Sequence, residues 1–151
     1  MRVILQRVDF GQVTVEGQTT GQIARGFVAL VGVTHADAPA QADLLARKTA
    51  QLRVFEDEAG KMNLALADVG GGVLVVSQFT LYADARKGRR PSFTEAARPD
   101  HAAPLVALYA QKLADYGVQR VEHGVFGAMM QVIIHNTGPV TIWLDSAELE
   151  A

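Results

Sequence analysis

Short apolar runs separated by glycines mark the beginning of this sequence. The runs are residues 3–8, 12–15 and 27–33, and the glycines around them are at positions 11, 17, 21 and 26. Residues 13–15 alternate apolar and polar side chains as a half-buried strand does, whereas residues 27–31 are continuously apolar, as in a strand covered on both faces. Glycines at such short intervals favour tight turns between neighbouring strands. The pattern predicts an antiparallel meander at the start of the chain.

Two later segments have a helical period. Apolar side chains recur at the spacing of one helical face between residues 38 and 54 and again between residues 101 and 116, where Gly117 supplies a stop signal. Further strand-like stretches are residues 73–76, 130–134 and 140–144. Between the last two, Asn136-Thr137-Gly138-Pro139 is typical of a tight turn.

This order of elements predicts an α+β fold with about seven strands. We expect a curved, mostly antiparallel, barrel-like sheet with two main helices packed outside it. Of the 151 residues, 49% are hydrophobic and 20% are charged, so a core can form without disulfides or metals. We therefore expect residues 1–151 to form a single domain.

The composition also excludes several kinds of site. Because the chain has no cysteine, it has no disulfide framework, cysteine nucleophile or iron–sulfur cluster. The four histidines lack metal-ligand spacing, so neither a metal nor a cofactor is expected. Residues 1–7 carry a charge within their apolar stretch and do not resemble a signal peptide, which favours a cytoplasmic location. A net charge of −2 argues against nonspecific coating of nucleic acid, so any RNA contact should be a local patch.

Ser77-Gln78-Phe79-Thr80 is the first candidate for chemistry. The buried run of residues 73–76 leads directly into these four residues, and backbone N–H groups become free where a strand ends. Such donors can stabilise the oxyanion that forms when an ester carbonyl is attacked. The same residues can equally be explained as the polar end of a strand, and from the residues alone both interpretations remain open.

Two further segments each have a structural and a functional interpretation. Gly138-Pro139 is either a plain turn or, if the peptide is cis, a pair of carbonyls that can accept a cation. The segment from 86 to 90 is either a solvated charge run or a phosphate-binding loop close to Thr80. Its cations are Arg86, Lys87, Arg89 and Arg90.

Six strings of residues, in order along nearly the whole chain, resemble the D-aminoacyl-tRNA deacylase family. They are residues 1–8, 52–57 together with 60–63, 76–84, 87–93, 124–128 and 136–141. The resemblance implies a homodimer that hydrolyses the ester between a D-amino acid, or glycine, and the 3′-terminal adenosine of tRNA. Glycine attached to tRNA(Ala) would be one such substrate.

The resemblance also implies a role for each candidate residue. Ser77, Gln78, Phe79 and Thr80 would line the aminoacyl-adenosine site, with N–H groups near Gln78 and Phe79 facing the ester. A cis Gly138-Pro139 peptide would enter the partner subunit's pocket, bind the α-amino group and exclude L side chains. Arg7 would hold this motif, to which Asn136 also belongs.

One position departs from the family. The family more often has Asp after the Asn of this motif, whereas this chain has Thr137. We expect its hydroxyl to form a local hydrogen bond that preserves the turn.

Thr80 has two possible roles. It would be either a nucleophile or a pocket wall beside an attacking water assisted by the tRNA 2′-hydroxyl, and we favour the water because no adjacent base is evident.

Two other functions would use the same features. A noncatalytic module could shelter the end of an aminoacyl-tRNA with its basic patch, and an esterase for small metabolites would not need that patch. Cleavage of matched D- and L-tyrosyl-tRNA separates all three. The salt dependence of RNA binding tests whether the basic residues take part.

Overall fold

One long strand organises the sheet in the computed structural model, which describes residues 1–149. β1 (Arg2–Val15) pairs antiparallel with three strands. On one side, β3 (Gly26–Gly32) pairs with residues 2–8 and β2 (Gln18–Ile23) with residues 11–15. On the other side, β8 (Met130–Asp145) pairs along almost the whole length of β1.

The predicted break in β1 at Gly11 is wrong. Gly11 remains in the strand, and its missing side chain serves a different purpose. A Cβ at Gly11 would lie 2.6 Å from Cγ2 of Val28 on the neighbouring strand. This glycine therefore allows the Val28 side chain to pack closely against β1, and it does not form a turn.

The rest of the sheet is parallel. β6 (Gly72–Ser77) pairs parallel with β3, and β7 (Arg120–His123) pairs parallel with β6. The prediction of a mostly antiparallel sheet is correct for the partners of β1 but wrong for these two pairs, so the sheet is mixed. Parallel neighbours need crossover connections, and the two main helices supply them. Buried β3 and β6 explain why residues 27–31 and 73–76 are continuously apolar.

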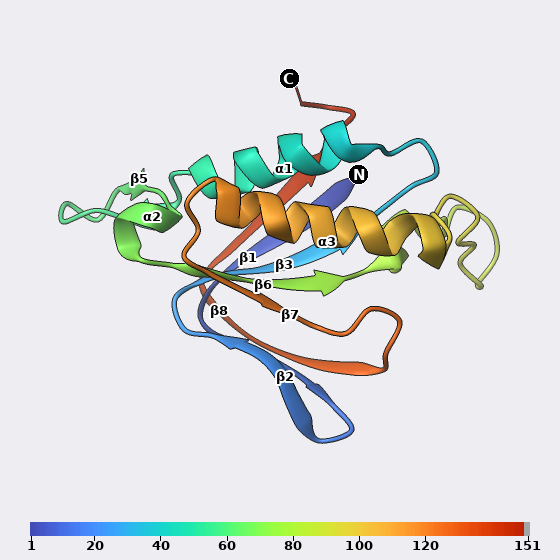
Figure 1. The fold of residues 1–151 in the computed structure, drawn as a ribbon, viewed down its shortest axis with the longest axis horizontal. Helices are drawn as coiled ribbons and strands as arrows, with labels where there is room; N and C mark the ends of the chain where they lie inside the picture. The colour runs from blue at the N-terminus through green and yellow to red at the C-terminus, as the bar shows by residue number, and fades with distance from the viewer. Residues whose placement is uncertain (150–151) are drawn as a thin grey trace.

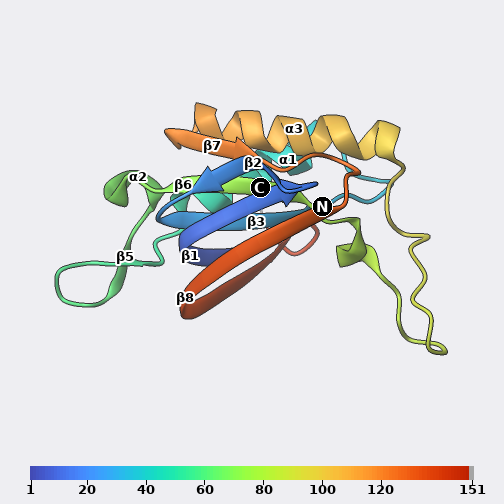
Figure 2. The same cartoon turned by 90° about the horizontal axis from the view of Figure 1, so that it is seen from below.

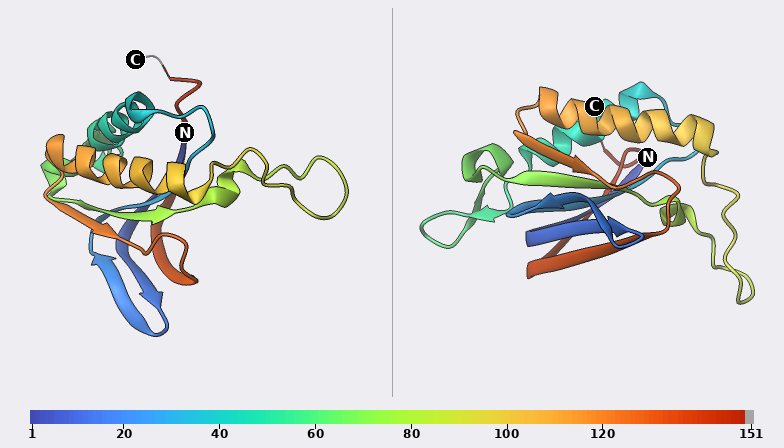
Figure 3. Two further views of the ribbon diagram at one scale, coloured as in Figure 1. Left: turned by 45° about the vertical axis from the view of Figure 1, so that its right-hand side comes forward. Right: turned by 60° about the horizontal axis from the view of Figure 1, so that its bottom comes forward.

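The sheet curves until its two ends almost meet (Figures 2 and 3). The hydroxyl of Thr20, on β2, donates to the carbonyl of His123, on β7, at 3.4 Å. A Cβ at Gly21 would lie 2.5 Å from the same carbonyl oxygen, so only glycine fits there. The predicted barrel-like shape is therefore confirmed as a nearly closed barrel.

The two main helices lie side by side on one face of the sheet (Figure 1). They are α1 (Pro39–Gln51) and α3 (Pro99–Asp115), and each begins with a proline, which suits the first turn of a helix. Between them and the sheet lies the larger core cluster, which includes fully buried Leu45, Tyr109 and Leu113. A smaller apolar cluster, which includes Val28 and Leu74, lies on the other face.

Four short elements complete the fold. They are β4 (Phe55–Glu56), β5 (Met62–Leu64), α2 (Leu66–Val69) and the 3₁₀ helix η1 (Phe79–Tyr82). β4 and β5 form a separate hairpin. Among the helices of residues 1–149, none is both long and apolar enough to cross a membrane.

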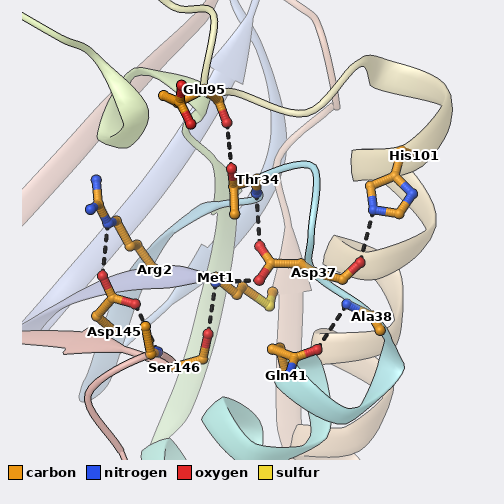
Figure 4. Close-up of polar contacts among 11 residues, drawn as sticks. Met1, Arg2, Thr34, Asp37, Ala38, Gln41, Glu95, His101, Asp145 and Ser146 are labelled. Carbon is orange, nitrogen blue, oxygen red and sulfur yellow. Dashed lines mark hydrogen bonds and ion pairs between the residues drawn. The ribbon is translucent and has the colours of Figure 1, made fainter.

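A polar network joins the two ends of the chain to the loops beside the helices (Figure 4). The α-ammonium of Met1 is buried and donates to Asp37 at 2.5 Å and to Ser146 at 2.8 Å. The other carboxylate oxygen of Asp37 accepts the N–H of Thr34, and its carbonyl lies 2.9 Å from Nε2 of His101. This network fixes the turn before α1 against the first turn of α3.

Candidate active site

A cavity of about 410 Å³ opens where β6 ends. Three of the predicted site residues, Ser77, Gln78 and Phe79, contribute to its wall. The remaining wall is mostly apolar and comes from β3, the segment before α3, α3 itself and the loop after β7. Those residues are Val31, Val33, Phe93, Ala96, Ala97, Arg98, Pro99, Ala102, Val106, Phe126 and Gly127.

The backbone at this strand end presents two free donors. The N–H of Gln78 is not one of them, because it donates to the carbonyl of Val31 at 2.7 Å. The N–H groups of Phe79 and Thr80 begin the 3₁₀ helix and have no acceptor within residues 1–149. Of the N–H groups near Gln78 and Phe79, that of Phe79 is therefore free, and the second free N–H belongs to Thr80.

Thr80 lies beside the cavity and is not part of its wall. Its exposed Oγ1 accepts a hydrogen bond from Nε2 of Gln78 at 2.5 Å. No histidine or carboxylate within residues 1–149 forms a hydrogen bond with this hydroxyl. A neutral donor on the oxygen and the lack of a base both oppose activation of Thr80 as a nucleophile.

Residues 137–140 form a bulge within β8, so the predicted tight turn between two strands is wrong. Gln6 pairs with Thr141 and Val8 with Asn136, which leaves four residues of β8 opposite the single residue Arg7. The Gly138-Pro139 peptide in this bulge is cis. Because β1 continues straight past it, the chain does not reverse at this point.

Polar side chains hold the bulge at both ends. Oδ1 of Asn136 accepts the N–H of Val140 at 2.9 Å, which bridges the base of the bulge. Nε of buried Arg7 donates to the carbonyl of Thr137 at 3.1 Å, and its Nη1 donates to Val54 at 2.7 Å. The hydroxyl of Thr137 donates to the carbonyl of His135 at 3.3 Å, which confirms the expected local bond.

Within one chain the two candidate motifs lie far apart. Gly138 lines a separate cavity of about 280 Å³ with Arg7, and the larger cavity contains no residue of the bulge. Arg7 pairs with Phe27, which pairs with Val73, so the bulge is separated from Ser77 by three strand spacings and four residues along β6. That places the motifs roughly 20 Å apart.

The basic residues occupy the tip of a loop that projects from the body of the molecule (Figure 3). A backbone bridge between Asp84 and Ser92 closes the loop, and the tip from 86 to 90 is fully exposed. Arg86 is held by Asp84 through two charged contacts of 2.8 and 2.7 Å. These side-chain hydrogen bonds lower the pKa of Asp84 to about 2. Lys87, Arg89 and Arg90 form no such ion pair within residues 1–149.

The wall residues beyond β6 were not among the predicted site residues. Phe93 and Phe126 lie in strings that resemble the family, so this resemblance could have identified them as site residues. Arg98 and Ala102 had no such signal, because the start of α3 reaches the cavity only through tertiary packing.

Comparison with known proteins gives a consistent result. Residues 4–145 match the family model described as D-Tyr-tRNA(Tyr) deacylase. A D-aminoacyl-tRNA deacylase from Thermomicrobium roseum is 63% identical over 99% of this chain and 96% of its own length. The corresponding protein from Chloroflexus aurantiacus is 58% identical over 99% of this chain and 92% of its own.

Two solved structures share the fold. One, titled c-Myc DNA Unwinding Element Binding Protein, superposes with a TM-score of 0.89 at 38% identity and covers 96% of this chain and 98% of its own. The other, titled as a probable eukaryotic D-amino acid tRNA deacylase, has a TM-score of 0.81 over 95% of this chain and 97% of its own. At 18% identity, the second supports the fold alone.

Proposed function

This chain belongs to the D-Tyr-tRNA(Tyr) deacylase family, and on that premise we propose that its two motifs meet in a homodimer to select and hydrolyse D-aminoacyl-tRNA. The activity itself is that of a D-aminoacyl-tRNA deacylase, an ester hydrolase. The observation that carries it is the 63% identity with a D-aminoacyl-tRNA deacylase over 99% of the chain. The proposed steps of substrate selection and hydrolysis rest on the geometry of the two motifs.

The esterified 3′-terminal adenosine would occupy the 410 Å³ cavity, with the ester near the end of β6. An apolar cavity bordered by a few polar groups suits a small ligand with an aromatic base. The free N–H groups of Phe79 and Thr80 would then stabilise the oxyanion that develops on the ester carbonyl. Preorganised donors of this kind contribute about 3–4 kcal/mol each in other hydrolases.

Gly138 and Pro139 would come from the partner subunit. The separation of roughly 20 Å within one chain supports this arrangement, because a single copy cannot bring its own bulge to its own cavity. The carbonyls of the bulge would accept the α-ammonium of the substrate. With both amino group and carbonyl fixed, an L side chain would overlap backbone, while a D side chain would point to solvent.

Glycine esters should escape this selection. Since glycine has no side chain, a steric filter at Cα cannot distinguish it, and we expect hydrolysis of glycyl-tRNA(Ala) as well. The exposed cations Lys87, Arg89 and Arg90 would contact tRNA phosphates during either reaction.

A water molecule, rather than Thr80, would attack the ester. The lack of a base beside Thr80 within residues 1–149 supports this assignment. The 2′-hydroxyl of the terminal ribose would lie next to the reacting ester and assist proton transfer.

Matched D- and L-tyrosyl-tRNA test the proposal. We expect rapid loss of the D ester and of glycyl-tRNA(Ala), with the L ester stable over the same period. Equal cleavage of D and L esters would contradict the chirality filter. Protection of both esters would contradict hydrolysis itself.

A further inference from the structure

Two exposed aromatic rings border the 410 Å³ cavity. Phe79 is 56% exposed and Phe93 is 36% exposed, although both contribute to the cavity wall. Their ring centroids are 5.1 Å apart and their planes meet at 69°. An edge-to-face pair of this kind leaves ring surface open to solvent at the rim of the cavity.

Hydrogen bonds on both sides of Phe93 tie its backbone to the body of the molecule. Its neighbour Ser92 exchanges two hydrogen bonds with Asp84, at 2.7 and 2.8 Å. On the other side, Nε2 of His35 lies 2.7 Å from the carbonyl of Thr94. Phe93 therefore lies at the base of the projecting loop, rather than at its tip.

Cations lie close to the aromatic pair along the chain. Arg89 and Arg90 precede Phe93 by a few residues, and Arg98, whose side chain is 86% exposed, contributes to the cavity wall. Exposed aromatic rings beside cations are the combination by which proteins bind single-stranded nucleic acid, because each base stacks on a ring while its phosphate is neutralised.

The size of the cavity limits what it can hold. At about 410 Å³ it lies near the lower end of the range for a single small ligand. If the esterified nucleoside fills the cavity, the nucleotide on its 5′ side must lie outside the cavity, at its rim. The exposed rings of Phe79 and Phe93 border this rim.

We propose that Phe93 stacks against the base of the nucleotide that precedes the esterified terminal nucleoside. This inference rests on the proposed function, and it adds a second nucleotide subsite to the cavity. Within residues 1–149, Arg98 is the one cationic residue among those that line the cavity, and it would contact the phosphodiester that joins the two nucleotides. The subsite distinguishes a tRNA end from a free aminoacyl-nucleoside.

Two substrates of different length test the subsite. One is 3′-O-D-tyrosyl-adenosine, and the other carries one additional pyrimidine nucleotide on its 5′ side. For Phe93→Leu we expect kcat/KM on the longer ester to fall about tenfold relative to the shorter one, which corresponds to about 1.4 kcal/mol. Phe93→Trp should retain the wild-type ratio. Tyr116→Leu is the matched control, since Tyr116 is also 36% exposed but lies at the opposite end of α3.

Two outcomes overturn the proposal. An equal loss on both esters would make Phe93 only a wall of the cavity, and no loss on either would remove it from the site. Wild-type protein that cleaves neither of these esters nor D-tyrosyl-tRNA would instead refute the proposed function. In that event, a binding measurement tests whether the second nucleotide subsite exists. Fluorescence of Phe93→Trp, compared with wild type and its single Trp143, should be quenched by the unesterified dinucleotide and not by adenosine.

Discussion

Gly138 shows at the scale of one residue how the bulge depends on its sequence. Its φ of +128° lies in a region that L side chains rarely adopt. A Cβ there would lie 2.9 Å from Nη2 of Arg7 and from Cγ2 of Val140. Arg7 also holds the carbonyl of Thr137, so a side chain at 138 would disturb the residue that positions the bulge.

Gly138→Ala should therefore lower kcat/KM for D-tyrosyl-tRNA by about tenfold or more, because strain of about 1–3 kcal/mol falls directly on the bulge. Deacylation rates measured under single-turnover conditions provide the check. The matched control is Gly17→Ala, since Gly17 also has a positive φ but a Cβ there would meet no atom within 4 Å. Equal activity of the two variants would contradict a functional role for the bulge.

Thr80 provides a second test at this scale. Its hydroxyl has no base among its hydrogen-bond partners within residues 1–149, so we expect Thr80→Ala to retain deacylation within about tenfold of wild type. Rapid quenching followed by mass spectrometry of the intact wild-type protein should reveal no acyl-enzyme. A trapped acyl-Thr80, or complete loss of activity in the variant, would assign the attack to Thr80.

At the scale of elements, some features could be predicted from sequence and others could not. β3, β6 and the two main helices follow from local patterns, because continuous apolar runs and a helical period do not depend on distant partners. The bulge in β8 was predicted as a turn, since Gly138-Pro139 has the same local signature in both settings. Only the pairing of β8 with β1 distinguishes them. The partner of the Gln78 N–H is likewise fixed by β3, which is distant in sequence.

The basic tip of the projecting loop can be tested for contact with tRNA phosphates. If Lys87, Arg89 and Arg90 contact phosphates, replacing all three with alanine should reduce the slope of log Kd against log salt for tRNA by about 2, at about 0.7 per contact. Filter binding at several salt concentrations measures this slope. Arg86→Ala is the control, because Asp84 already holds Arg86 and little change is expected. An unchanged slope in the triple variant would exclude the loop tip from RNA binding.

At the scale of the whole molecule, the polar network in Figure 4 joins the chain ends to the elements around the cavity. Asp37 is 6% exposed and pairs with the buried α-ammonium of Met1. It also contacts Thr34, whose hydroxyl donates to the carbonyl of Glu95 beside the cavity. Stability and the shape of the cavity wall therefore depend on the same contacts.

Asp37→Asn should lower the free energy of unfolding by about 3 kcal/mol, because it leaves a buried ammonium without its counter-charge. Urea unfolding at one fixed protein concentration measures this, since the stability of an oligomer depends on concentration. Asp100→Asn should cost less than about 1 kcal/mol, because its contact with Arg98 is exposed. Similar costs for both variants would contradict a structural role for the network.

If each site combines the cavity of one copy with the bulge of another, subunit mixing should restore activity to two variants that have each lost it. Ser77→Trp fills the cavity and Gly138→Ala disturbs the bulge, so each homodimer should retain at most about a tenth of wild-type activity on D-tyrosyl-tRNA. A heterodimer of the two variants contains one intact cavity facing one intact bulge. After subunits are exchanged between equal amounts of the two variants, half of the dimers contain one copy of each variant. In each of these mixed dimers, one of the two sites is intact. We predict recovery of about a quarter of wild-type activity. Activity that stays at the level of the separate variants, although mass spectrometry detects the mixed dimer, would contradict a site shared between two copies.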